Sequence, residues 1–255
     1  MDAIRLPVDA VNARKDNYIW IFPTGPDSVA AVDPGEAEPV LRYLSEHSRR
    51  LSHVLITHHH ADHIEGIDAL RARHQPLVVG AAADQSRLPP LDLPVADQAT
   101  PLLGEREVRV LATPGHTSAH LAYQVADALF VGDTLFRYGC GRLFEGTPEQ
   151  MWRSLLKIRA LPETTRLFPA HEYTRLNLRF VQSLLPDDQE LQQQMTTVCQ
   201  MMDSGTRTLP VELRWEKRFN PFLLCDDSNF VKRIGAAAQS PEVLFATLRE
   251  RRNHF

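Results

Sequence analysis

Hydrophobic and polar positions follow two different patterns along the 255-residue chain. Up to about residue 170, short apolar runs of the kind that form buried strands alternate with segments of helical spacing. The predicted strands cover residues 54–56, 77–80, 108–111, 121–125 and 129–131. After His171 the strand pattern fades, and residues 176–185 and 190–202 have helical spacing instead. The chain therefore predicts an α/β part followed by a smaller helical part.

Two more helices are predicted from the residues that would begin them. Thr147 is expected to cap a helix, because Pro148 follows in the first turn and Gln150 stands where a capping box needs it. Ser240 and Pro241 repeat this pairing of a cap with a proline, so they predict a last helix near the C-terminus.

Residues that bind metals follow directly after four apolar runs. The segment after the first run, residues 58–63, supplies three candidate imidazoles and a carboxylate. Each of the three later runs is followed by one more such side chain. The candidates are His58, His60, Asp62, His63, His116, Asp133 and His171. Strand ends of an open α/β sheet meet at one edge, so these side chains are expected to converge. A single catalytic zinc takes about three protein ligands, so the set indicates more than one ion.

Each candidate also has a simpler reading. A single histidine such as His116 or His171 is more often structural or exposed than a metal ligand. Asp133 alone could cap a strand end. Because four candidates lie close together in residues 58–63, the favoured interpretation is that the whole set binds metal. His59 is predicted to be a non-ligand, because an extended backbone would point it away from its neighbours. His120 and Asp33 are expected to support the site or a turn without binding metal.

The motifs resemble those of a known superfamily. The metallo-β-lactamase superfamily has motifs similar to THHHADH (57–63), PGHT (114–117), GDTLF (132–136) and PAHEYT (169–174). The narrower glyoxalase II family, the hydroxyacylglutathione hydrolases, has segments similar to DNYIW (16–20), VDPG (32–35), CGRLFEG (140–146) and NPFL (220–223), and a basic C-terminal helix. The resemblance covers nearly the whole chain.

This resemblance implies a fold and a division into domains. The implied fold is of the α/β class: a metallo-β-lactamase-like αββα sandwich followed by a small all-helical C-terminal domain. Residues 1–172 are expected to form the catalytic domain and residues 173–255 the helical, substrate-binding domain.

The resemblance also divides the metal candidates between two sites. The first site is His58, His60 and His116, the second is Asp62, His63 and His171, and Asp133 is the expected bridge. Two ions about 3.5–4 Å apart can share a water and lower its pKa towards neutrality, so metal-bound hydroxide is the expected nucleophile. Two divalent ions are therefore expected, with zinc as the first choice and iron or manganese as alternatives.

The implied reaction converts S-2-hydroxyacylglutathione, such as S-D-lactoylglutathione, to a 2-hydroxy acid and glutathione, the second step of methylglyoxal detoxification. The family binds the tripeptide with basic residues and a tyrosine, which correspond here to Arg142, Arg249, Arg252 and Tyr173. Arginine suits the two carboxylates because its donors form a planar fork. The simpler reading is a solvated basic helix end. Phe144 stands where some members have a tyrosine, which removes one hydroxyl.

The composition of the chain indicates which classes of partner to expect. The chain is 43% hydrophobic and 24% charged, with a formal net charge of -4 that argues against nucleic acid as a partner. No apolar run approaches the ~18–20 residues that span a bilayer, and the N-terminus lacks an apolar signal-peptide core. Cys140, Cys199 and Cys225 are an odd, scattered set, which indicates reduced thiols. We therefore expect a cytoplasmic monomer that binds a small molecule and no membrane.

Three other functions remain open. A phosphodiesterase or ribonuclease of the superfamily would need a basic surface. A persulfide dioxygenase would need one iron, and the complete ligand set argues for two metals instead. A metal-binding module without catalysis would keep the ligands but would not turn over a thioester.

Overall fold

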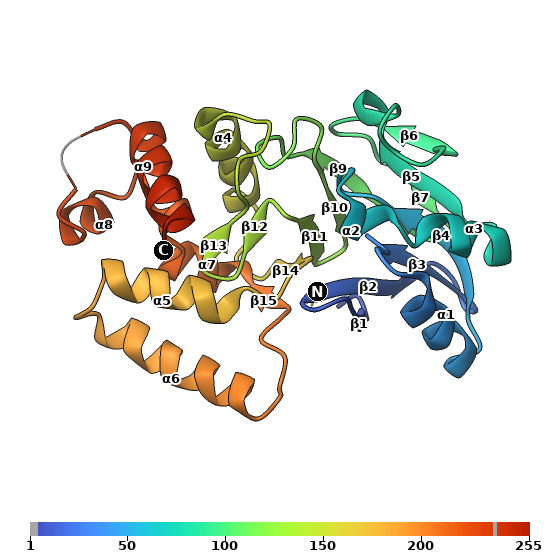
Figure 1. Ribbon diagram of the computed structural model, residues 1–255, viewed down its shortest axis with the longest axis horizontal. Coiled ribbons are helices and arrows are strands. Elements are labelled where there is room, and N and C mark those ends of the chain that lie inside the picture. The colour runs from blue at the N-terminus through green and yellow to red at the C-terminus, as the bar shows by residue number, and fades with distance from the viewer. Residues whose placement is uncertain (1–4, 237–238) are drawn as a thin grey trace.

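Two sheets packed face to face form the centre of the computed structural model, which describes residues 5–236 and 239–255 (Figure 1). The six-stranded sheet has the order β1-β2-β3-β4-β5-β6, and the five-stranded sheet has the order β15-β14-β11-β10-β9. The first sheet contains β1 (Asp9–Ala13), β2 (Asn17–Pro23), β3 (Ser28–Val32), β4 (Arg50–Leu55), β5 (Leu77–Ala81) and β6 (Leu93–Val95). The second contains β9 (Arg109–Ala112), β10 (Leu121–Val125), β11 (Ala128–Gly132), β14 (Arg166–Pro169) and β15 (Val211–Glu212). Two small hairpins complete the strands, β7–β8 (Leu102–Leu103, Arg106–Glu107) and β12–β13 (Leu135–Phe136, Gly139–Cys140).

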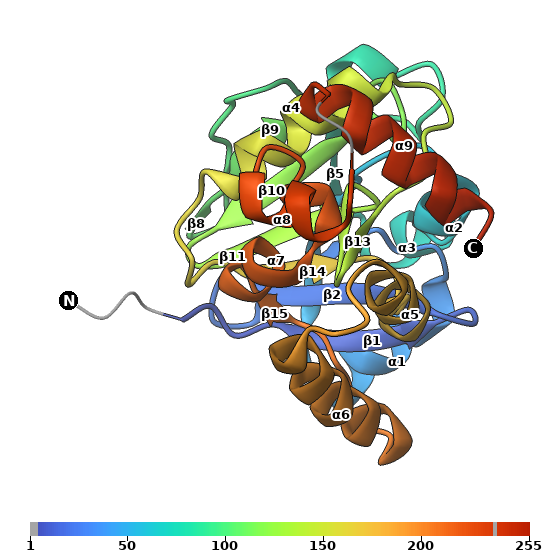
Figure 2. The ribbon, with the colours of Figure 1, turned by 90° about the vertical axis from the view of Figure 1, so that its left-hand side faces the viewer.

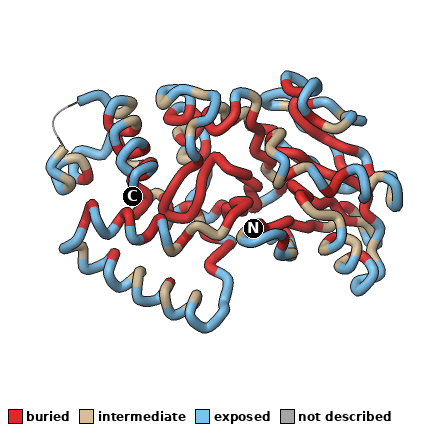
Figure 3. The backbone as a smooth tube through the Cα atoms, in the orientation of Figure 1, coloured by how far each residue is buried: buried red, intermediate tan, exposed pale blue. Residues whose placement is uncertain are grey.

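The core lies between the sheets, where the buried positions gather in Figure 3. Phe22 of β2 stacks on Phe130 of β11 with ring centroids 5.2 Å apart, and Trp20 meets Phe168 of β14 edge to face at 5.0 Å. A strand that is covered on both faces needs apolar residues on both faces. This explains why the sequences of the central strands are continuous apolar runs. The implied sandwich is therefore confirmed.

Helices cover the outer faces. Contacts with β1 and β4 place α1 (Ala37–Glu46) and α3 (Ile67–His74) against the first sheet, whereas α4 (Pro148–Arg159) packs against the last helix. Apart from β15, which pairs with β14, the C-terminal part is helical as expected, and its helices gather on the side that faces the viewer in Figure 2. They are α5 (Thr174–Leu184), α6 (Gln189–Asp203), α7 (Leu213–Phe219), α8 (Ser228–Arg233) and α9 (Pro241–Asn253). In the described ranges, no helix has both the length and the apolar character to cross a bilayer.

The predicted helix starts are confirmed. Thr147 and Gln150 form the expected capping box, with the Gln150 amide 3.2 Å from the Thr147 hydroxyl and the Thr147 amide 2.9 Å from Gln150 Oε1. Ser240 caps α9 through its hydroxyl, which accepts the Val243 amide at 3.4 Å. The helices α5 and α6 begin one or two residues earlier than their apolar spacing predicts. In α6 the reason is Asp188, whose side chain accepts the Leu191 amide and so fixes the first turn.

A buried carboxyl group joins the helical part to the β12–β13 hairpin. Glu216 of α7 is fully buried, and its Oε2 accepts the Tyr138 amide at 2.7 Å and the Asn220 side-chain amide at 2.8 Å. Asn220 also donates to the Gly139 carbonyl at 3.0 Å. Tyr138 turns the hairpin with φ 60°, so these bonds hold a sharp turn in place. Cys140 and Arg142 follow this turn, so Glu216 and Asn220 support the loop that reaches the site.

This contact predicts a pH-dependent stability. Burial raises the pKa of Glu216 from 4.5 to about 7, although hydrogen bonds from Asn220 and Tyr138 oppose it. The folded protein therefore holds this proton more tightly than the unfolded chain, and the resulting stabilisation is complete below pH 4.5 and lost as the pH rises through 7. Glu216→Gln is neutral at every pH, so its stability does not depend on this proton. Relative to wild type, its Tm should rise between about pH 5 and about pH 8; parallel Tm curves would contradict the assignment.

Candidate metal centre and substrate cavity

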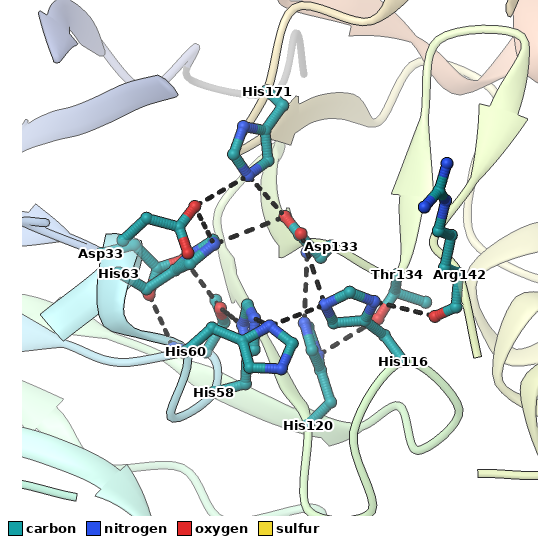
Figure 4. A network of polar contacts seen from close by, with 12 residues as sticks. Asp33, His58, His60, His63, His116, His120, Asp133, Thr134, Arg142 and His171 are labelled. Carbon is teal, nitrogen blue, oxygen red and sulfur yellow. Dashed lines mark hydrogen bonds and ion pairs between the residues drawn. The ribbon is translucent and has the colours of Figure 1, made fainter. Parts of the chain in front are cut away.

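Four strand ends deliver the metal-type side chains to one place. The β4 strand leads into a loop and the short helix α2 (Ala61–Ile64), which together carry the first four candidates. His116 follows β9, Asp133 follows β11 and His171 follows β14. Figure 4 shows the five histidines and Asp133 of this set converging from both sheets. Gly132 lets β11 come close to the loop after β4: a side chain at this position, where φ is 48°, would place its Cβ 2.4 Å from the Thr57 hydroxyl.

Three histidines form the first cluster, which we call the three-histidine group: His58, His60 and His116. His60 Nδ1 lies 3.0 Å from His58 Nε2 and 3.1 Å from His116 Nε2. With metal–nitrogen bonds of about 2.0–2.1 Å, the nitrogens around one tetrahedral ion lie about 3.3 Å apart. The spacing of the three nitrogens therefore fits a single ion.

Two histidines and a carboxylate form the second cluster, the mixed group: Asp62, His63 and His171. Asp62 Oδ2 lies 3.4 Å from His63 Nε2 and 3.3 Å from His171 Nε2. In the described part of the chain, His63 Nε2 is buried and has no hydrogen-bond partner. A buried polar atom without a partner is rare, and a bound cation would satisfy it.

Asp133 lies between the two groups. Its Oδ2 is 3.4 Å from His116 Nε2, while its Oδ1 is 3.4 Å from His171 Nε2 and 3.7 Å from His63 Nε2. One oxygen thus faces each group, as Figure 4 shows. Among the residues described, Asp133 Oδ1 is another buried atom that lacks a hydrogen-bond partner. A carboxylate in this position can bind two ions at once.

Neighbouring groups orient the ring nitrogens. The Arg142 carbonyl accepts from His116 Nδ1 at 2.8 Å, and Asp16 lies 3.0 Å from His171 Nδ1, so Nε2 of both rings points inward. Asp33 Oδ2 lies 3.0 Å from His63 Nδ1. Such outer contacts fix the tautomer that a metal needs.

The two groups differ in charge. Burial lowers the pKa of every member of the three-histidine group, so these imidazoles are neutral and able to bind a cation. Burial opposes charge on His63 and His171 as well, but Asp133 and the other carboxylates outweigh it and raise the pKa of His63 to about 10 and that of His171 to about 11. The negative charge of the site is therefore concentrated around the mixed group.

A cavity of roughly 530 Å³ opens over the cluster. Members of both groups line it, and so do three arginines and the rings of two phenylalanines and a tyrosine: Arg142, Arg249, Arg252, Phe136, Phe144 and Tyr173. The Tyr173 ring stacks on His171 at 4.8 Å. The Phe144 ring, 62% exposed, lies 5.2 Å from His116 and 5.5 Å from His60.

Comparison with known proteins places the chain in a family. The model of the metallo-beta-lactamase superfamily matches residues 17–171, and the model of the hydroxyacylglutathione hydrolase C-terminus matches residues 172–255. The hydroxyacylglutathione hydrolase of Rhodobacter capsulatus is 45% identical over 254 residues, which cover 98% of this chain and 99% of that protein. The enzyme of the same name from Photobacterium profundum is 45% identical, with coverage of 98% and 100%. The chain belongs to the hydroxyacylglutathione hydrolase family.

The same fold occurs in a solved structure of ETHE1 from Myxococcus xanthus, with a TM-score of 0.66 and 25% identity over 98% of each chain. The family resemblance expected from the motifs is thus confirmed, and so is the expectation of a metal-dependent hydrolase.

The structure brings all seven predicted ligands together and places two nearby histidines elsewhere. His59 Nδ1 lies 3.0 Å from Asp84, outside the cluster. His120 is fully buried and accepts the Asp133 amide on Nε2 at 3.2 Å, so it supports the backbone of Asp133. Both arrangements agree with the non-ligand interpretation.

The C-terminal arginines differ from the simpler expectation of a solvated helix end. Arg249 is 5% exposed and Arg252 is 9% exposed. Arg249 donates to the Cys140 carbonyl at 2.6 Å, and Arg252 donates to Asn177 Oδ1 at 3.0 Å from Nη2. The simpler interpretation, a basic helix end exposed to solvent, is therefore wrong, because both side chains point into the protein.

Several residues support the site through contacts that the sequence does not indicate. Asn17 donates to Asp62 Oδ2 at 3.0 Å, and Asp16 contacts His171 across 155 positions of the chain. Asn177 holds Arg252 from the middle of α5. Asn17 and Asp16 belong to a motif of the resemblance, but nothing in their spacing indicates these partners. Asn177 belongs to no motif.

Asp33 tests how much these outer contacts contribute. Its Oδ1 accepts the Thr57 amide at 2.7 Å, and its Oδ2 accepts the Thr57 hydroxyl at 2.7 Å and lies 3.0 Å from His63 Nδ1. Asp33→Asn removes the charge that orients His63, so we expect metal affinity at the mixed group to fall about 10–100-fold in competition with a chromophoric chelator. Asp203→Asn, at an exposed pair with Arg175, is the matched control. Equal affinity in both variants would exclude the orienting role.

Proposed function

We propose that this chain hydrolyses S-2-hydroxyacylglutathione, such as S-D-lactoylglutathione, to a 2-hydroxy acid and free glutathione. One observation carries the proposal: a single cavity is lined both by the metal-type residues and by Arg142, Arg249 and Arg252. A glutathione thioester has its reacting carbonyl at one part of the molecule and two carboxylates at another. It therefore needs metal ligands and cations in one cavity.

The charges of the three arginines support an anionic ligand. In the chain as described, none of them pairs with a carboxylate. Burial lowers the pKa of Arg252, and the nearby Arg249 and Arg142 lower it further. Arginine stays charged at any ordinary pH, so the three cations repel one another until an anion enters. Their role would be to bind the glycine and glutamate carboxylates of the tripeptide and so to orient the thioester.

The metal-type residues would hold two divalent ions, and zinc is our first choice, with iron or manganese as alternatives. The two ions would occupy the three-histidine group and the mixed group, with Asp133 as the bridge. The inward nitrogens, the two orphaned buried atoms and the nitrogen spacing of about 3 Å all fit such ions. When bound, the pair supplies Lewis-acid polarisation of the carbonyl and an activated water.

The chain's own residues would set the geometry of the reaction. Burial and the nearby carboxylates raise the pKa of Tyr173, so its phenol keeps its proton and can donate a hydrogen bond to the tripeptide. Phe144 would shield the three-histidine side of the cavity from water. The leaving thiolate is stable enough to depart without a strong general acid, which agrees with the lack of such a group in the motifs.

A substrate panel tests the reaction. The purified protein should hydrolyse S-D-lactoylglutathione, lose that activity with a chelator and regain it with metal. It should act far more slowly on bis(p-nitrophenyl) phosphate and should not consume oxygen with glutathione persulfide. Hydrolysis of the phosphodiester alone would favour the phosphodiesterase function, oxygen uptake the dioxygenase function, and no turnover a metal-binding module.

The surroundings of the enzyme complete the proposal. The three cysteines are free, which supports a reducing compartment, and we place the protein in the cytoplasm as a monomer without a nucleic-acid partner. Residues 1–172 would carry the catalytic groups, and residues 173–255 would add Tyr173, Arg249 and Arg252 for the tripeptide.

A further inference from the structure

A polar cluster beside the site has no role in the reaction described so far. Glu145 accepts hydrogen bonds from the Ser118 amide and hydroxyl, both at 2.8 Å, and from Arg87 Nη1 at 2.5 Å. Arg87 Nε in turn donates to Asp84 Oδ1 at 2.5 Å. The other Asp84 oxygen lies 3.0 Å from His59 Nδ1. Asp84 is only 2% exposed, so one end of the cluster is fixed in the protein.

The cluster joins the segment of Asp84 and Arg87 to three segments that border the cavity. His59 lies between two members of the three-histidine group, and Ser118 comes two residues after His116. Glu145 belongs to residues 141–146, which we call the substrate loop because it carries Arg142 and Phe144. Arg87 contributes no group to the cavity itself. Together with His59, whose Nε2 lies 3.5 Å from Glu145 Oε1, it links a fixed acid to the substrate loop.

The substrate loop is held by His116 on its inner side and through Glu145 on its outer side. The Arg142 carbonyl accepts from His116 Nδ1 at 2.8 Å, and the Phe144 amide donates to the His116 carbonyl at 3.2 Å. Within the described residues, the Arg142 guanidinium has no hydrogen-bond partner, so its position depends on the loop backbone. On the outer side Ser118, His59 and Arg87 all contact Glu145, and Arg87 adds the charge of a guanidinium that is anchored on Asp84. Its hydrogen bond is the largest cause that lowers the pKa of Glu145, to about 2. The Glu145 carboxylate is thus ionised throughout the working range.

We propose that the Arg87–Glu145 ion pair positions the substrate loop, and through it sets the affinity for the tripeptide part of the substrate. Arg87 and Glu145 are positioning residues, since neither touches the reacting atoms. The inference rests on the proposed role of Arg142 in binding a glutathione carboxylate. The alternative is an ordinary surface ion pair, 39% and 27% exposed, which would add little to stability and nothing to binding.

Kinetics with two substrates separate these possibilities. Arg87→Ala should raise KM for S-D-lactoylglutathione about threefold to tenfold, with kcat and bound metal unchanged, because a displaced binding group weakens both ground state and transition state. Hydrolysis of a short thioester without the tripeptide should not change. Glu145→Gln, which keeps an acceptor for Ser118 but loses the charge, should raise KM less than Glu145→Ala. Arg153→Ala, at an exposed pair with Glu149 on α4, is the control and should match wild type.

A double-mutant cycle supplies the decisive readout. If Arg87 acts through Glu145, the KM of Arg87→Ala/Glu145→Ala should equal that of the worse single variant and not the product of the two effects. Coupling in Tm with an unchanged KM would overturn the proposal, and so would a fall in kcat with lost metal. Arg142→Ala is measured in parallel. An unchanged KM in Arg142→Ala would overturn the binding role of Arg142 and the loop inference with it, whereas a raised KM there and an unchanged KM in Arg87→Ala would overturn the positioning role alone.

Discussion

Replacing Asp133 by alanine is expected to empty both metal groups and to lower kcat/KM for S-D-lactoylglutathione by at least about a thousandfold. Asp133 directs one oxygen towards His116 and the other towards His63 and His171, all within 3.7 Å. Its removal leaves each group one ligand short. It also leaves two cations, at a separation of about 3.5–4 Å, without the shared negative charge that offsets their repulsion. Metal content measured after dialysis, together with the rate, checks the prediction.

Two controls accompany this variant. Asp133→Asn keeps the shape and one oxygen, so it should retain more metal than Asp133→Ala but less than wild type. Asp226→Asn removes an exposed carboxylate that pairs with Arg159, and it should leave metal content and rate unchanged. Two ions bound to Asp133→Ala with unchanged affinity would show that the bridging assignment is wrong.

The second large effect is expected from the buried arginines of α9. Hydrogen bonds to charged groups contribute about 1.5–3 kcal/mol, so Arg249→Met and Arg252→Met should each lower kcat/KM about tenfold or more, mainly through KM. Methionine keeps apolar volume where Arg249 lies 5.2 Å from the Phe222 ring. If both arginines bind one carboxylate, the double variant should lose less than the product of the single effects.

The same helix offers the matched control. Arg251 lies between Arg249 and Arg252 in sequence but is exposed, so Arg251→Met should leave KM unchanged. A short thioester without the tripeptide should be hydrolysed equally by the wild type and by each of the three single variants. Wild-type kinetics in both buried variants would assign these arginines to packing alone, through Cys140 and Asn177.

The sequence predicts which side chains converge because the pattern is local: each of the four segments that carry them directly follows an apolar run. The expectation of a single sheet edge is incomplete, because β4 lies in the first sheet whereas β9, β11 and β14 lie in the second, so the packing of the two sheets brings His58 to His116 and His171. The helix starts at Thr147 and Ser240 are equally local, since a cap and a proline lie within a few residues of each other.

Contacts between distant segments could not be predicted in this way. Glu216 meets Tyr138 across 78 positions, and Arg87 meets Glu145 across 58, and neither pair has a distinctive spacing. The burial of Arg252 depends on how α9 packs against α5, where Asn177 receives its guanidinium. A periodic pattern shows that a helix has two faces, but tertiary packing decides whether a basic face lines a cavity.

The most direct test of the account is a metal titration of the metal-free protein, with S-D-lactoylglutathione hydrolysis followed at each addition. Two groups that share Asp133 predict two bound zinc ions per chain, with most of the activity appearing as the second equivalent binds. Full activity at one equivalent would contradict the two-ion account. So would a protein that holds two ions and leaves the thioester intact.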